Sequence, residues 1–273
     1  MITQKAGFMK LRNIKLILAY DGSRYAGWQR LKGEKGKRSV QSVLEESLSL
    51  VLQEDIQITG SGRTDKGVHA MGQAANFKCH TELTMLEIQA LTNKVLPEDI
   101  RILDVRDVPM VFHSRKSAIT KTYEYRVEIG KIPSVFHRGY VYAIEKELDV
   151  KAMKEAAGLL LGTHDFRSFS SEKREDYNTV RRIDSIQVEP FILSEYICAK
   201  QVRISVTGNG FLYNMVRIIV GTLLEIGLQE RKAEDIIRIL ESRKRENAGV
   251  TLPPEGLYLK EVTFPVEINF KIK

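Results

Sequence analysis

The chain has 273 residues, of which 43% are apolar and 28% are charged, and its formal net charge at pH 7 is +7. These values are typical of a soluble globular protein with a substantial core, and the excess of cations suits either an anionic partner or a mildly basic enzyme without one. The distant cysteines Cys79 and Cys198 argue against a disulfide scaffold, and the longest apolar stretch, 215–228, contains Arg217 and Glu225 and so predicts no membrane span. Because the N-terminus lacks a signal-peptide pattern, we expect a cytoplasmic protein. Because the two cysteines are far apart and the five histidines are scattered, we also expect no bound metal.

The first 110 residues are predicted to follow the order β-α-β-β-α-β. Alternating apolar residues predict a strand over 12–21, and a glycine-rich basic loop over 22–38 follows it. Ser39 is placed to cap a helix over 40–53, where apolar residues recur at helical spacing. The remaining predicted elements are a short strand over 55–59, a strand over 72–79, a helix over 84–95 and a strand over 100–107.

The second half is predicted to repeat this order, although its sequence shows no strong repeat of the first. Its predicted elements are a strand over 114–129, a helix over 149–161, strands over 180–190 and 197–207, helices over 212–227 and 232–243, and a strand over 257–264. We therefore predict an α+β protein of two ferredoxin-like β-α-β-β-α-β halves with antiparallel sheets, 1–110 and 111–273. The interface between the halves would form a central active-site cleft.

The segment GRTDKGVHA, residues 62–70, has the pattern of a reactive loop. Asp65 has cations and His69 as close neighbours, and glycines at 60, 62 and 67 allow positive φ and a close approach to a ligand. A carboxylate held beside cations stays ionised and can act as a nucleophile or base. The same pattern also describes an ordinary charged surface turn. It is not a dinucleotide fingerprint, because Asp65 stands where the third glycine is required.

Arg217 lies in a helix, 211–227, that is apolar around most of its circumference and is therefore predicted to be buried. A buried guanidinium cannot lose its charge and needs a carboxylate partner. Glu225 is too far along the same helix, so we expect Asp65 to lie within hydrogen-bond reach of Arg217. The alternative is an arginine that extends to solvent or forms a purely structural ion pair.

Three further patterns each allow two interpretations. Tyr123 and Tyr125 share one face of a strand, where aromatic residues either build a core or stack on a flipped-out base. The His-Asp-Phe segment 164–166 follows a predicted helix end and is either acid–base machinery or a packing motif. The loop 22–38 interleaves six cations with Tyr25 and Trp28, which suits phosphate contacts with base stacking or a solvated charged loop.

Six segments, in this order and over nearly the whole chain, resemble the tRNA pseudouridine synthase A family. They are YDGSRYAGWQ at 20–29, GRTDKGVHA at 62–70, FHSR with TYEYR within 112–126, GTHDFRSF at 162–169, GFLYNMVRIIVGTLLEIG at 210–227 and PPEGLYL at 253–259. The chain departs from the family pattern in its long basic loop after Trp28 and in Lys66, where alanine is frequent.

The resemblance implies an isomerase that breaks the N1–C1′ bond of uridine, turns the uracil and rejoins it through C5, without a metal or an organic cofactor. It makes Asp65 the catalytic carboxylate, acting on C1′ or C6 or first removing a ribose proton. Arg217 would hold Asp65 ionised, and Tyr123 would contact the target base. Arg63 would help to displace the uridine from its stack, and Leu257 would form an apolar wall.

The family also implies uridines 38, 39 and 40 of the tRNA anticodon arm as targets, and a homodimer whose basic surface spans one tRNA. Several target positions suggest recognition of tRNA shape rather than of one base sequence. Two alternatives are a non-catalytic RNA-binding protein on the same scaffold and a paralogue that modifies other uridines. The combination of Asp65, Arg217 and Tyr123 argues against the first, because a binding protein has no need of a buried charge pair.

Overall fold

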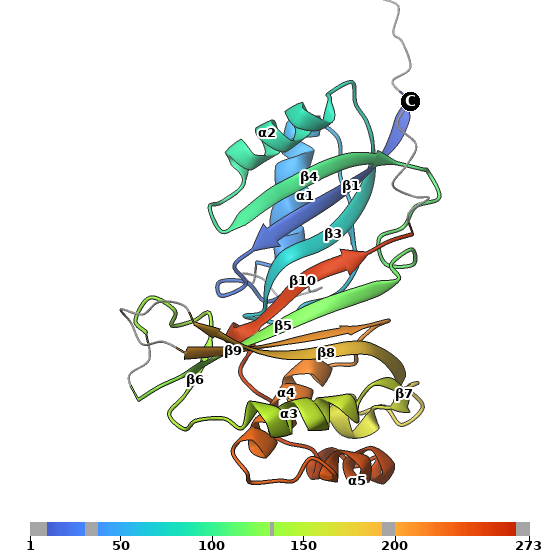
Figure 1. Ribbon diagram of the computed structural model, residues 1–273. Helices are drawn as coiled ribbons and strands as arrows, with labels where there is room; N and C mark the ends of the chain where they lie inside the picture. Colours follow the sequence, from blue (N-terminus) through green and yellow to red (C-terminus); the bar gives the residue numbers. More distant parts are fainter. Residues whose placement is uncertain (1–9, 31–37, 132–133, 193–199, 266–273) are drawn as a thin grey trace, which may run out of the picture. The chain divides into compact units, whose positions relative to one another are not determined.

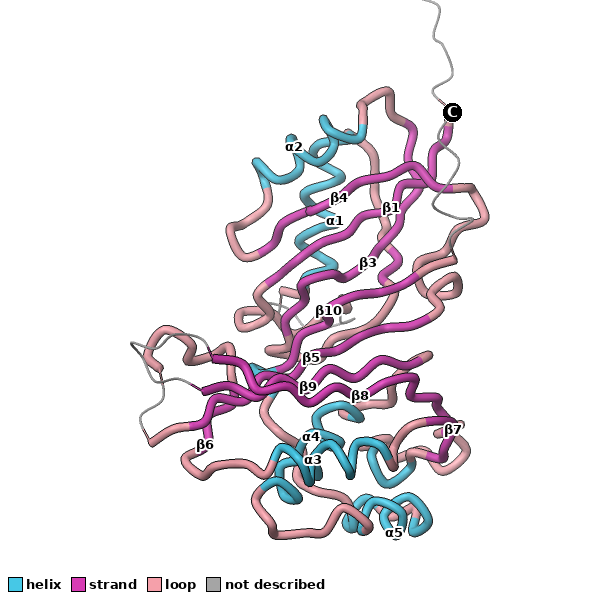
Figure 2. The backbone as a smooth tube through the Cα atoms, in the orientation of Figure 1, coloured by secondary structure: helices cyan, strands magenta, loops and turns pink. Residues whose placement is uncertain are grey.

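The structure is a computed structural model that describes residues 10–30, 38–131, 134–192 and 200–265. It is a mixed α and β structure with mostly antiparallel strand pairing (Figures 1 and 2). The described residues divide into two compact units, which differ from a single division of the chain near residue 110. Unit 1 is drawn from Met1–Lys66, Ala70–Ala118 and Val262–Lys273, and unit 2 from Gly67–His69 and Ile119–Glu261.

Unit 1 is built on a sheet in which the strand order is β4-β1-β3, with the short β2 paired to β3, and all of these pairs are antiparallel. Its elements follow the predicted order: β1 (Leu11–Tyr20), α1 (Val40–Leu52), β2 (Thr59–Gly60), β3 (His69–His80), α2 (Met85–Val95) and β4 (Ile100–Val108). The alternating side chains Ile14, Leu16 and Leu18 of β1 are fully buried, as the period-2 pattern predicts. Ser39 caps α1 in a reciprocal pair with Ser42.

The predicted strand over 55–59 is shorter and lies later, at Thr59–Gly60. Ile56 and Ile58 are buried, but their backbone N–H groups donate to side chains of α1 instead of to a neighbouring strand. Ile56 donates to Ser49 Oγ at 2.9 Å, and Ile58 to Glu45 Oε1 at 3.0 Å. These two bonds replace the ladder bonds that a longer strand would need.

Unit 2 contains a sheet in which the strand order is β10-β5-β9-β8-β7. Its elements are β5 (Thr120–Ile129), β6 (Tyr142–Ile144), α3 (Val150–Gly158), β7 (Gly162–Asp165), β8 (Val180–Ile192), β9 (Lys200–Gly208), α4 (Met215–Gly227), α5 (Asp235–Ser242) and β10 (Leu257–Thr263), with 3-10 turns at Arg167–Phe169, Arg245–Asn247 and Pro254–Gly256. The pairs β5–β9, β9–β8 and β8–β7 are antiparallel, whereas β6 runs parallel to β5. The prediction of purely antiparallel sheets is therefore wrong at β6.

Several predicted boundaries in this half shift for local reasons. The strand predicted from 114 begins only at Thr120, because hydrogen bonds from Phe112 to Pro109 and from Ser117 to His113 close two turns before it. The helix predicted from 212 begins at Met215, because Asn214 adopts φ +61°. Residues 197–199 of the predicted strand over 197–207 lie outside the described residues.

The described residues hold a few features that bear on the class of protein. None of their helices is long and apolar enough to cross a membrane, and no three of their histidine, cysteine or acidic side chains are grouped to hold a metal ion.

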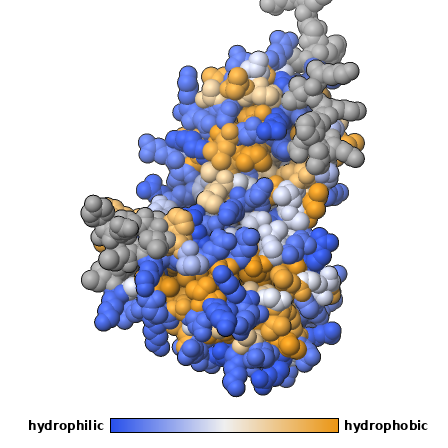
Figure 3. Space-filling view, in the orientation of Figure 1, coloured by the Kyte–Doolittle hydropathy of each residue, from blue (hydrophilic) through white to orange (hydrophobic). Residues whose placement is uncertain are grey.

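Cys79 is buried in β3, and burial raises the pKa of its thiol to about 11. Hydrophilic residues cover most of the face seen in Figure 3, and apolar ones gather there in patches.

Candidate active site

The loop that carries Asp65 joins β2 to β3, and its side chains alternate between burial and exposure. Thr64 is buried, Asp65 is half-buried, and Arg63 and Lys66 are exposed. The neighbouring cations predicted from the sequence are therefore solvent-accessible groups on either side of the carboxylate. The residue immediately before Asp65 is buried, so the loop is attached to unit 1 at that point.

Two residues of the segment 20–29 hold Thr64. The Tyr20 hydroxyl is hydrogen-bonded to Thr64 Oγ1 at 2.8 Å, and the backbone N–H of Trp28 donates to the Thr64 carbonyl at 3.0 Å. Both aromatic residues are buried, with their ring centroids 6.0 Å apart. Burial raises the pKa of Tyr20, which keeps its hydroxyl protonated and able to donate. Thr64 is thus fixed through its side chain and its backbone.

Gly27 allows the chain to pass directly against this loop. It adopts φ +100°, and a Cβ there would lie 2.6 Å from the Thr64 carbonyl oxygen and 3.1 Å from the Asp65 carbonyl carbon. Only glycine meets both conditions without strain. The Gly27 carbonyl also accepts the first N–H of α1, from Val40 at 3.1 Å. The backbone around Asp65 is therefore tied to the start of α1.

The other side of the loop is held by Gln73 of β3, which is fully buried. Ser61 Oγ donates to Gln73 Oε1 at 2.8 Å, and Gln73 Nε2 donates to the Gly62 carbonyl at 2.9 Å. Positive φ was predicted to be available to the glycines at 60, 62 and 67, but of these three only Gly67 adopts it, with φ +79°. Gly60 instead makes room for the Trp28 ring. Tyr20, Gly27 and Gln73 were not identified as site residues from the sequence, although the first two lie in the segment 20–29 that carries the family resemblance.

Removing the Tyr20 hydroxyl is expected to destabilise the protein. A Tyr20→Phe variant leaves the buried Thr64 hydroxyl without this partner, which typically costs about 1–3 kcal/mol of unfolding free energy. Urea unfolding of the variant against the wild type measures the loss. Tyr213→Phe is the control, because Tyr213 is 56% exposed and its change should stay within about 0.5 kcal/mol. Equal stability of the two variants would show that Tyr20 does not hold the loop.

The end of the loop belongs to unit 2. His69 is buried, and its ring stacks on Tyr258 at 4.8 Å and lies 5.3 Å from Tyr140. The Tyr258 hydroxyl donates to the Tyr140 carbonyl at 2.8 Å, and the Arg126 guanidinium lies 4.1 Å from the Tyr258 ring centroid. His69 is therefore part of an aromatic stack on β10, which anchors the chain just after the Asp65 loop.

Two further candidates, Tyr123 and Leu257, are buried in unit 2. Tyr123 of β5 is 8% exposed, and its ring meets that of Phe211 edge-on at 5.2 Å. Tyr125, two residues along, is fully buried and its hydroxyl donates to the Pro253 carbonyl at 2.8 Å. Leu257 is 6% exposed and is the first residue of β10. Tyr125 therefore serves the core, and its hydrogen bond fixes the segment that leads to Leu257.

Arg217 is half-buried on α4, a helix whose other residues are mostly buried. Its Nε donates to the Leu252 carbonyl at 2.6 Å, and its Nη1 donates to Asn214 Oδ1 at 2.7 Å. Glu225, which lies farther along the same helix, pairs with Arg231. Arg217 belongs to unit 2 and Asp65 to unit 1, and hydrogen bonding between their side chains stays a prediction.

The position of Leu252 beside Arg217 depends on Gly221. A Cβ on Gly221 would overlap the carbonyl oxygen of Val250, so only glycine lets α4 approach this segment. A second bond, from Gly249 N–H to Thr222 Oγ1 at 2.9 Å, holds the same segment against the helix. The acceptor for the Arg217 guanidinium is thus supplied by close packing of backbone on backbone.

The segment 164–166 is engaged in packing and local hydrogen bonds. His164 Nε2 is 2.7 Å from the Leu161 carbonyl, and Asp165 accepts a hydrogen bond from Thr179 and pairs with Arg243 at 3.2 Å. Phe166 is fully buried. These contacts favour the packing interpretation over acid–base machinery.

The aromatic residues of the basic loop after β1 are not placed to stack on RNA bases. Tyr25 and Trp28 are both buried, and the Tyr25 hydroxyl donates to Asp99, so neither ring offers a platform for a base. Arg24 and Arg30 are exposed, and Arg30 pairs with Glu45 at 2.9 Å. Residues 31–37, with Lys32, Lys35 and Lys37, lie outside the described residues. The prediction that these two aromatic residues stack on bases is therefore wrong, and the two exposed arginines are solvent-accessible cations.

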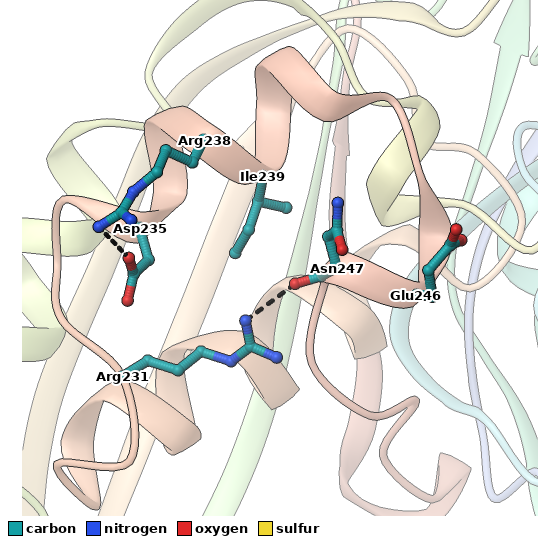
Figure 4. A pocket seen from close by; sticks show the side chains of 6 residues that line it. All are labelled: Arg231, Asp235, Arg238, Ile239, Glu246 and Asn247. Carbon is teal, nitrogen blue, oxygen red and sulfur yellow. Dashed lines mark hydrogen bonds and ion pairs between the residues drawn. The ribbon is translucent and has the colours of Figure 1, made fainter.

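A pocket of about 300 Å³ lies elsewhere in unit 2 (Figure 4). Its lining consists of Arg231, Asp235, Arg238, Ile239, Glu246 and Asn247. Arg238 pairs with Asp235 at 2.7 Å, and Arg231 Nη1 donates to the Asn247 carbonyl at 2.9 Å. Its two cations are thus already bound by protein groups, and none of the predicted site residues lines it.

Comparison with known proteins agrees with the motif pattern. A family model described as tRNA pseudouridine synthase matches residues 16–115 and 156–265, which include Asp65, Arg217 and Leu257 but not Tyr123. The tRNA pseudouridine synthase A 2 of Clostridium tetani is 44% identical over 253 residues, 93% of this chain and 99% of that protein. The tRNA pseudouridine synthase A of Acetivibrio thermocellus is 41% identical over 254 residues, 93% of this chain and 100% of that protein. The chain therefore belongs to the tRNA pseudouridine synthase family, a family of isomerases.

Proposed function

We propose that the protein isomerises uridine to pseudouridine at positions 38, 39 and 40 of the tRNA anticodon stem-loop, with Asp65 as the catalytic nucleophile. Family membership over most of the chain carries this proposal. The attachment of the Asp65 loop supports it, because a nucleophile must be held in one geometry to attack efficiently. Thr64 and Gly27 supply that restraint on the residues next to the carboxylate.

The reaction keeps every atom of the uridine. The N1–C1′ bond breaks, the uracil turns, and a C5–C1′ bond forms while C5 loses a proton and N1 gains one. One carboxylate is enough for this chemistry, whereas ordinary glycoside hydrolysis uses two carboxylates and a water molecule. Asp65 acts either on C1′ or C6 or by first removing a ribose proton, and water must be kept from the intermediate.

The other site residues assist Asp65 in this proposal. Arg217 keeps the carboxylate ionised and oriented, since an adjacent arginine typically lowers a carboxyl pKa by about 1–3 units. Tyr123 contacts the target base, and Leu257 forms an apolar wall of its pocket. Arg63 helps to displace the uridine from the helical stack, and its exposure on the loop leaves it accessible to RNA.

We also propose two ferredoxin-like halves, 1–110 and 111–273, that form a central active-site cleft in a cytoplasmic homodimer. The strand orders β4-β1-β3-β2 and β10-β5-β9-β8 support the halves. In each order the last strand of the half lies beside the first, as two copies of one β-α-β-β-α-β topology require.

Mapping pseudouridine in tRNA after incubation with the purified protein tests the function. We expect new pseudouridine only at positions 38, 39 and 40, without added metal or cofactor. Modification at other uridines would identify a paralogue with a different target. Tight tRNA binding without any pseudouridine would favour the non-catalytic RNA-binding alternative.

A further inference from the structure

A basic turn, defined as residues 113–117, lies in unit 1 just before β5 in the sequence. Arg115 and Lys116 are exposed at its tip, and no salt bridge joins either of them to an acid among the described residues. The sequence contains no aspartate or glutamate between Asp107 and Glu124. The turn therefore presents two adjacent cations without local neutralisation, unlike Arg174, whose charge is met by Glu172 at 2.9 Å.

A buried hydrogen-bond network fixes the basic turn to the sheet. Ser114 is fully buried, and its N–H and Oγ donate to Asn76 Oδ1 at 2.8 and 2.7 Å. Asn76 Nδ2 donates to Asn13 Oδ1 at 2.9 Å, and Asn13 Nδ2 donates to the carbonyls of Pro109 and Phe112 at 3.0 Å each. Asn13 on β1 and Asn76 on β3 thus hold both ends of one short segment.

The basic turn is also closed upon itself. His113 Nδ1 lies 3.2 Å from the Arg115 N–H and 3.4 Å from the Lys116 N–H, and accepts from both. The Ser117 N–H donates to the His113 carbonyl at 2.8 Å, and Ser117 Oγ accepts the His113 N–H at 3.2 Å. The backbone N–H groups of all five residues of the turn are therefore hydrogen-bonded, which fixes the backbone beneath both cations.

We propose that the basic turn is a contact for the phosphate groups of the tRNA backbone, a proposal that rests on the proposed function. Burying two asparagines is costly unless all their groups are bonded, and such a network specifies one geometry. The network of Asn13 and Asn76 holds a turn whose exposed residues are the two cations at its tip. Arginine and lysine held in this way bind phosphate without reading base sequence. The partner chemistry that fits is the phosphodiester backbone of RNA.

Salt-dependent tRNA binding by an Arg115→Gln, Lys116→Gln double variant tests the proposal. Neutralising two phosphate contacts should reduce the slope of log affinity against log salt by about 2 and weaken binding on the order of tenfold at moderate salt. The loss should be the same for different tRNAs, and turnover at saturating tRNA should change less than about twofold, because these contacts position the backbone and not the reacting base.

Two further variants complete the experiment. Lys94→Gln removes an exposed cation from α2 of the same unit and should leave the slope nearly unchanged. Ser114→Ala retains both cations but loses one bond to Asn76, and should weaken binding about threefold through lost preorganisation. An unchanged slope in the double variant, or an equal loss in Lys94→Gln, would overturn the proposal. The two proposals fail separately. If the wild type forms pseudouridine and the double variant binds tRNA as tightly as the wild type, only the role of the basic turn is contradicted. If the wild type forms no pseudouridine but the double variant binds tRNA more weakly, only the catalytic function is contradicted.

Discussion

Replacing Asp65 by asparagine is expected to abolish pseudouridine formation while tRNA binding and folding persist. Asparagine has nearly the same shape but carries no negative charge, so it cannot act as the nucleophile. Loss of a residue that forms the covalent intermediate typically lowers the rate by at least about a thousandfold. The fold should tolerate the change, because Asp65 is only half-buried and the loop is attached through Thr64. Single-turnover pseudouridine formation with saturating enzyme measures the loss directly.

The matched control is Asp55→Asn. Asp55 is exposed in the same unit and lies ten residues before Asp65 in the sequence. Its replacement removes the same charge from the protein and should leave the rate within about twofold of wild type, as for surface substitutions in general. Residual turnover near the wild-type rate in Asp65→Asn would remove Asp65 from the mechanism.

Replacing Gly27 by alanine is expected to give the largest loss of stability among simple changes around the loop. An alanine at φ +100° is strained, and its Cβ would lie 2.6 Å from the Thr64 carbonyl oxygen. Left-handed strain costs about 1–2 kcal/mol, and overpacking adds about 1–3 kcal/mol, so unfolding free energy should fall by about 2–5 kcal/mol. Turnover should fall as well, because the atoms that must shift belong to the backbone of Thr64 and Asp65.

Gly139→Ala separates the two contributions. Gly139 has φ +83° but no heavy atom within 4 Å of its Cβ position, so alanine there meets the conformational strain alone. Urea unfolding of both variants, with turnover assayed where each is folded, gives the comparison. Equal losses of stability with unchanged turnover in Gly27→Ala would mean that the contact with the Asp65 loop has no consequence.

Local patterns in the sequence were enough to predict most elements. The alternation in β1 and the capped, periodic α1 depend on residues close in the chain, and both were predicted within about one residue of their bounds. The two missed strands, β6 and β7, are three and four residues long and have little pattern of their own. Each exists because a distant strand, β5 or β8, pairs with it.

Side-chain environments were harder to predict than elements. Tyr25 and Trp28 lie among cations in the sequence, which suggested contact with RNA, yet both rings are buried in unit 1. Arg217 was expected to be buried, yet it is half-buried, and two of its hydrogen bonds go to the oxygens of Leu252 and Asn214. Neighbours in sequence do not reveal which face of a loop meets the core, because that depends on distant packing.

By itself, the sequence determined the family, the identity of the candidate residues and the order of the secondary structure, since these depend on motifs and local periodicity. Only the tertiary structure decided how Asp65 is supported. The Tyr20 hydroxyl and the Trp28 N–H bond to Thr64 across 44 and 36 positions of the chain, and Gly27 packs against the same backbone. The basic turn likewise depends on Asn13 and Asn76, two distant residues of one sheet. Such contacts arise when remote segments pack together, and no local pattern encodes them.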